Sequence, residues 1–171
     1  MRVSYEWLKG MVDVPADPQG LITELVRTGT EVAAVERVGA DITKVVTSQV
    51  IEKVPHPDSD HLYVCKMDVG GYNVDATGRP VPLQVVCGAQ NFKQGDKTVT
   101  ALVGATLPGG VTIKKGRLRG VDSCGMNCSS RELGLGEDQS GIMILPDDTP
   151  VGLDFTDRKS TRLNSSHVKL S

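Results

Sequence analysis

Hydrophobic positions follow two different patterns, one before and one after Val45. In the first part, Leu21, Ile22, Leu25 and Val26 recur at the spacing of one helix face. From Val45 onward, short apolar runs alternate with turn signals about every ten residues, which is typical of strands. The pattern therefore predicts an α+β chain, in which a small α+β unit precedes a strand-rich region.

The helix expected in the first part has signals at both of its ends. Asp17 suits the N-cap, Pro18 suits the first helical position, and Gly29 lies just past the expected end. A shorter helix capped by Ser4 is expected before it, and a strand over residues 31–38 after it. This unit is too small to bury much of a core of its own.

The region after Val45 consists mainly of short candidate strands. They are residues 45–54, 62–69, 83–87, 97–103, 112–118 and 141–145. Their number and spacing fit a small five-stranded Greek-key barrel better than a seven-stranded sandwich. One helix is expected over residues 129–135, because Ser129 and Glu132 have the spacing of a capping box.

These patterns divide the chain into three predicted parts. Residues 1–43 form the α+β unit and residues 44–155 form the barrel domain. Residues 156–171 are rich in Ser, Thr, Asn and Lys and contain few large apolar side chains. Such a composition predicts a disordered tail.

Composition narrows the protein class. The chain has 171 residues, of which 39% are apolar and 23% charged, so it can form a packed core. No apolar run approaches the ~20 residues of a membrane span, and the N-terminus lacks a secretory h-region. Four cysteines in a chain of this length do not form a disulfide scaffold. The expectation is a reduced, cytoplasmic protein.

Positive charge is concentrated in the middle of the chain. The net charge is −2, but residues 44–120 carry ten basic and six acidic side chains. Within them, Lys114, Lys115, Arg117 and Arg119 lie close together, and a period of two would place the last three on one strand face. Followed by a helix N-terminus, they could bind a phosphate backbone. An edge strand protected by solvated lysines is the alternative.

Motifs for catalysis and metal binding are weak or missing. The cluster from His56 to His61 holds two imidazoles and two carboxylates, but its prolines favour a rigid turn over a metal site. Cys124 and Cys128 form a CxxxC pattern, which is not the spacing of a zinc ribbon. The sequence also lacks GxSxG, GxxxxGK[ST] and strand-linked GxGxxG patterns. We therefore expect no catalytic residue, no metal site and no cofactor in this chain.

Several longer motifs occur in a fixed order along residues 1–155. They are Met1–Lys9 with its Trp7-Leu8 pair, Gly29-Thr-Glu31-Val32, His56-Pro57-x-x-Asp60-x-Leu62, Cys65-Lys66-x-Asp68-x-Gly70, Gln84-Val-Val-Cys87-Gly88-Ala89-x-Asn91, Leu107-Pro108-Gly109-Gly110, Leu118-Arg119-Gly120-Val121-x-Ser123-x-Gly125-Met126-x-Cys128-Ser129, Glu132-Leu133-Gly134-Leu135 and Gly141-Ile142-x-x-Leu145-Pro146. In these motifs the chain resembles the N-terminal region of the β subunit of bacterial phenylalanyl–tRNA synthetase, including its tRNA-binding OB-fold domain.

The resemblance implies an OB-fold that binds tRNA. The candidate RNA-binding residues are then Asn91, Lys114, Lys115, Arg117, Arg119, Ser123, Met126 and Ser129. Because the chain has few aromatic side chains, contacts to phosphate and ribose are expected to outweigh base stacking.

The resemblance also implies a parent enzyme that attaches phenylalanine to its tRNA with ATP and Mg²⁺, as an α2β2 tetramer. Its catalytic site lies on the α subunit, so tRNA and that α subunit are the expected partners. The alternative is a packing module that binds no tRNA of its own.

The chain departs from the family pattern in composition and in length. His61 replaces a usual lysine, Gln90 a usual proline and Asn127 an apolar residue, and residues 71–82 form an enlarged hairpin. The family's editing, central and anticodon-binding domains do not follow Phe155. We therefore expect a truncated fragment of that β subunit with a non-native tail, which resequencing the locus would test.

Overall fold

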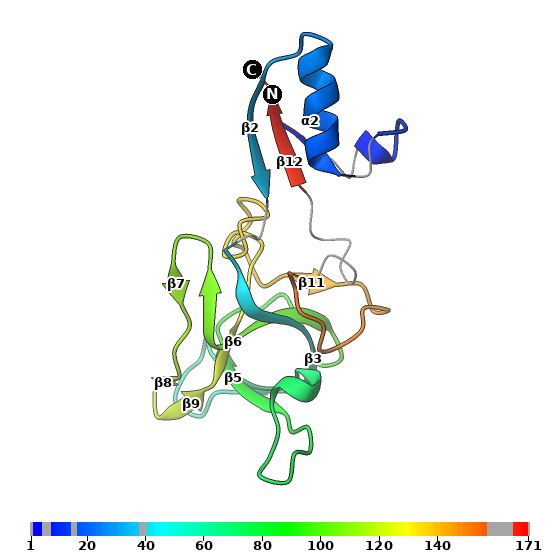
Figure 1. Cartoon of the computed structure of the whole chain (residues 1–171). Coiled ribbons are helices and arrows are strands. Elements are labelled where there is room, and N and C mark those ends of the chain that lie inside the picture. The colour runs from blue at the N-terminus through cyan, green and yellow to red at the C-terminus, as the bar shows by residue number, and fades with distance from the viewer. Residues whose placement is uncertain (1, 5–7, 15–16, 38–40, 157–165, 171) are drawn as a thin grey trace. The chain divides into compact units, whose positions relative to one another are not determined.

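The computed structural model describes residues 2–4, 8–14, 17–37, 41–156 and 166–170. It divides the chain into two compact units, residues 1–40 with 162–171 and residues 41–161 (Figure 1). The elements are β1 (Arg2–Ser4), α2 (Pro18–Arg27), β2 (Val32–Arg37), β3 (Thr43–Pro55), β4 (Tyr63–Asp68), the 3₁₀ turn η1 (Gly70–Tyr72), β5 (Leu83–Cys87), β6 (Lys97–Leu107), β7 (Val111–Thr112), β8 (Gly116–Leu118), β9 (Val121–Ser123), β10 (Gly125–Asn127), β11 (Ile144–Leu145) and β12 (Ser166–Leu170). This mostly stranded chain with one longer helix confirms the α+β class.

Helix α2 is bounded by the signals that the sequence predicts. The carboxylate of Asp17 accepts a hydrogen bond from the backbone N–H of Gly20. At the other end, the backbone N–H groups of Gly29 and Thr30 bond back into the last turn. Leu21 is buried on the inner face, whereas Val26 is exposed, so the predicted apolar stripe is narrower than expected.

The first unit also contains a three-stranded antiparallel sheet of order β1-β12-β2. Ser4 belongs to β1, and residues 5–7, where the helix capped by Ser4 was expected to begin and which include Trp7, lie outside the described residues. Residues 166–170 form β12, although their composition predicts disorder. Backbone N–H and C=O groups can complete a ladder between two strands whatever the side chains are. Residues 157–165 and 171 of the predicted tail lie outside the described residues.

The second unit is built on one coiled antiparallel sheet. Its main path is β10-β6-β3-β4-β5, with β7 and β11 paired to β6, while β8 and β9 form a separate hairpin. Among the described residues no ladder joins β5 to β10, so the hydrogen bonds between strands do not close this sheet into a barrel. The predicted five-stranded barrel is therefore not confirmed as a closed barrel.

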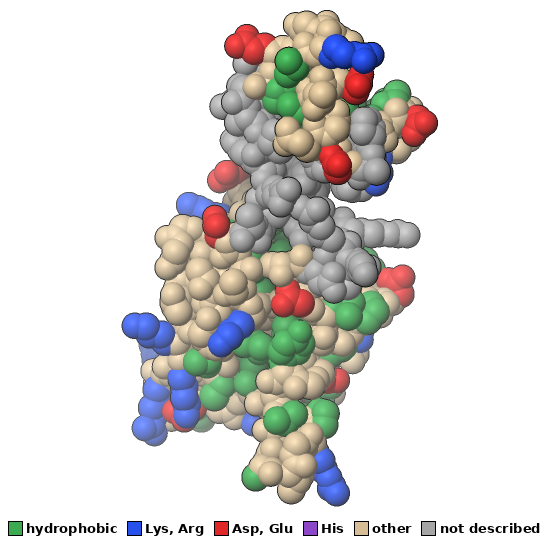
Figure 2. All heavy atoms as spheres, in the orientation of Figure 1, with side chains coloured by type: hydrophobic (Ala, Val, Ile, Leu, Met, Phe, Trp, Pro, Cys, Tyr) green, Lys and Arg blue, Asp and Glu red, His purple; other side chains and the backbone are tan. Residues whose placement is uncertain are grey.

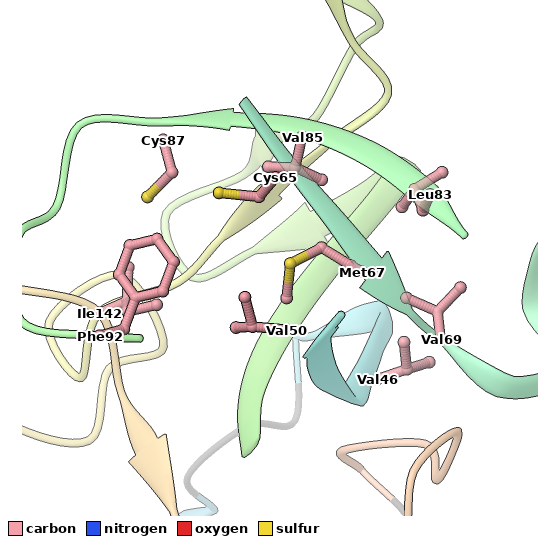
Figure 3. Packing of buried hydrophobic residues seen from close by; sticks show 10 residues of the cluster. All are labelled: Val46, Val50, Cys65, Met67, Val69, Leu83, Val85, Cys87, Phe92 and Ile142. Atoms are coloured by element: carbon pink, nitrogen blue, oxygen red, sulfur yellow. The ribbon is translucent and has the colours of Figure 1, made fainter. Parts of the chain in front are cut away.

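The core of the second unit lies on the concave side of this sheet. Side chains from β3, β4 and β5 meet there with three from segments between strands, Val69, Phe92 and Ile142, as Figure 3 shows. The cluster consists of Val46, Val50, Cys65, Met67, Val69, Leu83, Val85, Cys87, Phe92 and Ile142. Strand β3 is buried on both faces near Thr47, because residues 150–155 return along it through backbone bonds to Thr47 and Val45.

Two predicted elements differ from the structure. Residues 112–118 are not one strand, because β7 pairs with β6 whereas β8 pairs with β9. Between them, Ile113 is buried and its backbone bonds to Gly104 and Ala105 of β6. Residues 129–135 form a single turn and no helix. The capping box does form between Ser129 and Glu132, but Gly134 closes the turn at once through the Arg131 carbonyl.

In the part of the chain that the structure describes, no helix is long and apolar enough to cross a membrane.

Candidate nucleic-acid interface

Four cationic side chains lie on one short exposed stretch, residues 114–119, which we call the basic segment. It comprises two residues that precede β8, strand β8 itself and the first residue of the following turn. Lys114, Lys115, Arg117 and Arg119 are all exposed. Figure 2 shows Lys and Arg side chains gathered over the β7–β9 region.

A single carboxylate contacts two of these cations. Asp122 lies opposite Arg117 in the β8–β9 ladder. Its Oδ2 atom is 3.0 Å from the Lys115 ammonium and its Oδ1 atom is 3.8 Å from Nε of Arg117. The hydrogen bond and charge of Asp122 raise the pKa of Lys115, which therefore stays protonated. All three side chains are largely exposed, so these ion pairs contribute little to stability.

The hairpin turn directs the Arg119 side chain away from those of Lys115 and Arg117. Strands β8 and β9 are joined by Arg119 and Gly120, whose φ angles are +44° and +87°. Positive φ at both positions is the requirement of a type I′ turn. Lys115 and Arg117 do share one side, towards Asp122, but Arg119 donates from Nη1 to the backbone oxygen of Asp58 at 2.9 Å. The predicted common face of all three is therefore wrong for Arg119.

Ser123 and Ser129 use their hydroxyl groups inside the fold. The Ser123 hydroxyl accepts a bond from the Val86 N–H and donates one to the Gly125 oxygen. The Ser129 hydroxyl bonds to the Glu132 carboxylate. Both serines are buried, at 5% and 7% exposure. No helix N-terminus follows the basic segment, because residues 121–127 form β9 and β10.

Asn91 is exposed, but its side-chain amide also bonds within the protein. Its amide donates to the Ile142 carbonyl at 2.8 Å and accepts from the Ile142 N–H at 3.0 Å. A Cβ atom on the neighbouring Gly141 would overlap the Asn91 amide, so glycine is required for this close approach. The pair of bonds joins the loop after β5 to the segment before β11.

Met126 on β10 is partly exposed and lies in a groove of about 780 Å³. The groove runs between the end of β5, the β6–β7 turn and the loop that follows β10. Its lining includes Ala89, Pro108, Val111, Met126, Arg131 and Ile142. Ser129 also lines it, so the structure brings Met126 and Ser129 together there. The groove was not predictable from the sequence, because its walls come from segments that are separate along the chain.

The described side chains do not support the metal site that the histidine cluster and the cysteines could suggest, nor a reactive cysteine. Both ring nitrogens of buried His56 have hydrogen-bond partners within the protein. Among the described residues no three or more His, Cys, Asp or Glu side chains are grouped to hold a metal ion. Burial raises the pKa of Cys65 and of Cys128 to about 12, and it raises that of Cys87 as well. These thiols are therefore poor nucleophiles.

Three neighbours of the basic segment were not predicted from the sequence: Asp122, His56 and Asp58. The Arg119-Gly120 pair is a short hairpin signal, and a two-residue turn there places Asp122 opposite Arg117. That signal could have identified the ion pair. Nothing in the local sequence indicates that the hairpin turn lies beside His56 and Asp58.

Comparisons with known proteins show which family this chain is similar to. Residues 45–154 match the family described as "Putative tRNA binding domain". Phenylalanine–tRNA ligase beta subunits are similar over most of the chain: those of Anaeromyxobacter dehalogenans, Nitrosospira multiformis and Methylococcus capsulatus are 48%, 46% and 45% identical over 152, 155 and 157 residues. The alignments cover 89%, 91% and 92% of this chain but only 18%, 19% and 19% of those relatives. The predicted resemblance is confirmed.

Proposed function

This chain belongs to the tRNA-binding domain family, and from that premise we propose that it binds tRNA through the basic segment. The observation that carries the proposal is the charge of the β8–β9 hairpin. Four exposed cations lie there, and the Asp122 carboxylate contacts only two of them, Lys115 and Arg117. Lys114 has no hydrogen bond or ion pair with any described residue. Such a cluster attracts phosphates at long range and can contact several at once.

Of the other predicted site residues, Met126 and Asn91 remain candidates for direct contact, because Met126 is partly exposed and Asn91 is exposed. Ser123 and Ser129 are buried and bond to the protein itself, so we infer that they support the binding surface from the inside. Contacts to the phosphate backbone then dominate the interaction, and sequence preference is weak.

We infer further that the five strands of the main sheet form an OB-type barrel that is left open between β5 and β10. The strand order supports this inference, since β5 and β10 are the two ends of the path. The N–H of Cys124, between β9 and β10, donates to the Gln84 carbonyl on β5 at 2.8 Å. The buried hydroxyl of Ser123 adds a second link to β5, through the N–H of Val86.

We propose that the chain is the tRNA-binding part of a phenylalanine–tRNA ligase beta subunit, with residues 1–43 and 44–155 as its two domains. The identities of 45–48% with such subunits support this assignment. The partners would be tRNA and the α subunit of an α2β2 enzyme, whose ATP and Mg²⁺ are bound outside this chain. Cytoplasmic location follows from the proposed role in translation.

The experiment is a titration of the full chain with unfractionated bacterial tRNA at several salt concentrations. The variant K114A/R119A removes two cations that do not bond to Asp122. We expect weaker binding and a slope of log K against log salt that is flatter by about 0.7–0.9 for each lost phosphate contact. The matched control R79A/K93A removes two exposed cations from other loops and should keep the slope.

A third variant, K114A/K115A/R117A/R119A, decides between binding and packing. If its tRNA affinity equals that of the unmodified chain, the proposed function is wrong. Self-association of the same variant would then support the protected edge strand and the packing module instead.

A further inference from the structure

His56 is a buried histidine whose two ring nitrogens both bond to backbone groups. It is 4% exposed and lies directly after β3. Its Nδ1 atom is 3.0 Å from the backbone nitrogen of Asp58, and its Nε2 atom is 3.0 Å from the oxygen of Leu118. Because a backbone N–H can only donate, Nδ1 accepts and Nε2 carries the hydrogen that is donated to Leu118.

This bond is one of two between the turn after β3 and the tip of the β8–β9 hairpin. The other runs in the opposite direction, from the Arg119 guanidinium to the Asp58 oxygen at 2.9 Å. The turn itself is closed by the His56 N–H bonding to the Leu62 oxygen. Two adjacent residues of the hairpin tip are therefore attached to a turn that β3 and β4 hold in place.

We propose that His56 is a positioning residue for RNA binding, which sets the place of the basic segment through the Leu118 carbonyl. This proposal rests on the proposed function. Among the described residues the hairpin forms no ladder with another strand. Its β9 strand is linked to β5 by the Ser123 hydroxyl and by the Gln84 amide, which donates to the Asp122 oxygen, while its tip is held by the two bonds to the turn after β3. A hairpin already held in position loses less freedom when it binds phosphates, and this preorganisation increases affinity.

Two substitutions separate the two bonds of the ring. In H56N the side-chain oxygen can still accept from the Asp58 N–H, as in an Asx turn, but the side chain is too short to reach Leu118. In H56Q the longer amide can donate to the Leu118 oxygen. Titration of the full chain with unfractionated tRNA should show about three- to tenfold weaker binding for H56N. H56Q should recover most of this loss.

Amide hydrogen exchange supplies a readout on the hairpin itself. We expect the N–H of Val121, which pairs across the turn, to exchange faster in H56N than in H56Q. As a second variant, G120A puts a side chain at φ +87° where a Cβ meets no other atom, so its strain falls on the turn. G120A leaves His56 unchanged and should weaken tRNA binding. It therefore tests the effect of the hairpin position even if H56N does not fold.

The outcomes distinguish this proposal from the proposed function. If K114A/K115A/R117A/R119A loses tRNA binding but H56N and G120A bind as tightly as the unmodified chain, His56 is not a positioning residue. Equal losses in H56N and H56Q would also overturn the proposal, because Leu118 would then be irrelevant. If the quadruple variant keeps full affinity, the proposed function is wrong, and the role proposed for His56 is wrong with it.

Discussion

The hydroxyl group of Thr100 on β6 donates a 2.8 Å hydrogen bond to the side-chain amide oxygen of Asn127 on β10. The same Thr100 oxygen is 2.7 Å from the Ser48 hydroxyl, which is 2.9 Å from that of Thr98. All four side chains are buried, and the Asn127 amide also donates to the sulfur of Met67. A polar chain thus crosses three neighbouring strands inside the core.

We predict that T100V lowers the free energy of unfolding by about 1–3 kcal/mol, because it leaves the buried Asn127 oxygen without its donor. The double variant T100V/N127L should lose less than the sum of the two single variants. Urea denaturation of the four proteins measures this coupling. Additive losses would show that the two side chains act independently.

The contact between Gly141 and Asn91 leads to a second prediction. G141A should destabilise the chain by about 1–3 kcal/mol, because the added methyl group overlaps the Asn91 amide and breaks its bonds to Ile142. N91A removes the obstacle, so G141A should cost much less in that background. Thermal or urea unfolding gives the comparison, and an equal cost in both backgrounds would contradict the overlap.

Asp122 is predicted to weaken tRNA binding in the unmodified chain. D122N removes the carboxylate that pairs with Lys115 and Arg117, so the charge of both cations is no longer neutralised and attracts phosphates more strongly. We expect tighter binding, a steeper salt slope, and a change of less than about 1 kcal/mol in stability. The control D75N removes a charge from the exposed 71–82 hairpin and should leave the slope unchanged. Weaker binding by D122N would mean that the ion pairs are needed to shape the segment.

The cysteines should differ in their reactivity. Cys124 is partly exposed, whereas the pKa of Cys65 and of Cys128 is raised to about 12 by burial. At pH 8 we expect iodoacetamide to label Cys124 first in the native chain and all four thiols in guanidinium, as mass spectrometry would show. The variant C124S should lack the fast phase. Rapid native labelling of Cys65 or Cys128 would show that the core opens locally.

The same pKa shifts predict the response of stability to alkali. The folded-state pKa of Cys65 and Cys128 lies above the ordinary value of 9.0. As pH rises, the unfolded chain therefore loses these protons before the folded chain does. The protonated thiols contribute to the free energy of unfolding below pH 9, and this contribution is lost as pH rises towards 12. Urea midpoints measured from pH 8 to 11 should fall, and the serine variant C65S should fall less steeply than the unmodified chain.

The basic segment shows how far local sequence reasoning extends. Its charge, its exposure and its position next to a turn follow from residues close to one another, and each of them agrees with the structure. The break of the predicted strand 112–118 into β7 and β8 was not predictable, since β7 pairs with β6 whereas β8 pairs with β9.

The sequence by itself determined the elements whose signals are local. The caps of α2 are hydrogen bonds between residues three to five positions apart, and β5 coincides with the predicted range 83–87 because turn residues bound it on both sides. Only the tertiary structure decided that His56 meets Leu118 and that Asn91 meets Ile142, pairs separated by 62 and 51 positions. Such contacts arise when the whole sheet packs, and hydrophobic periodicity within a segment carries no information about which distant backbone group will lie beside it.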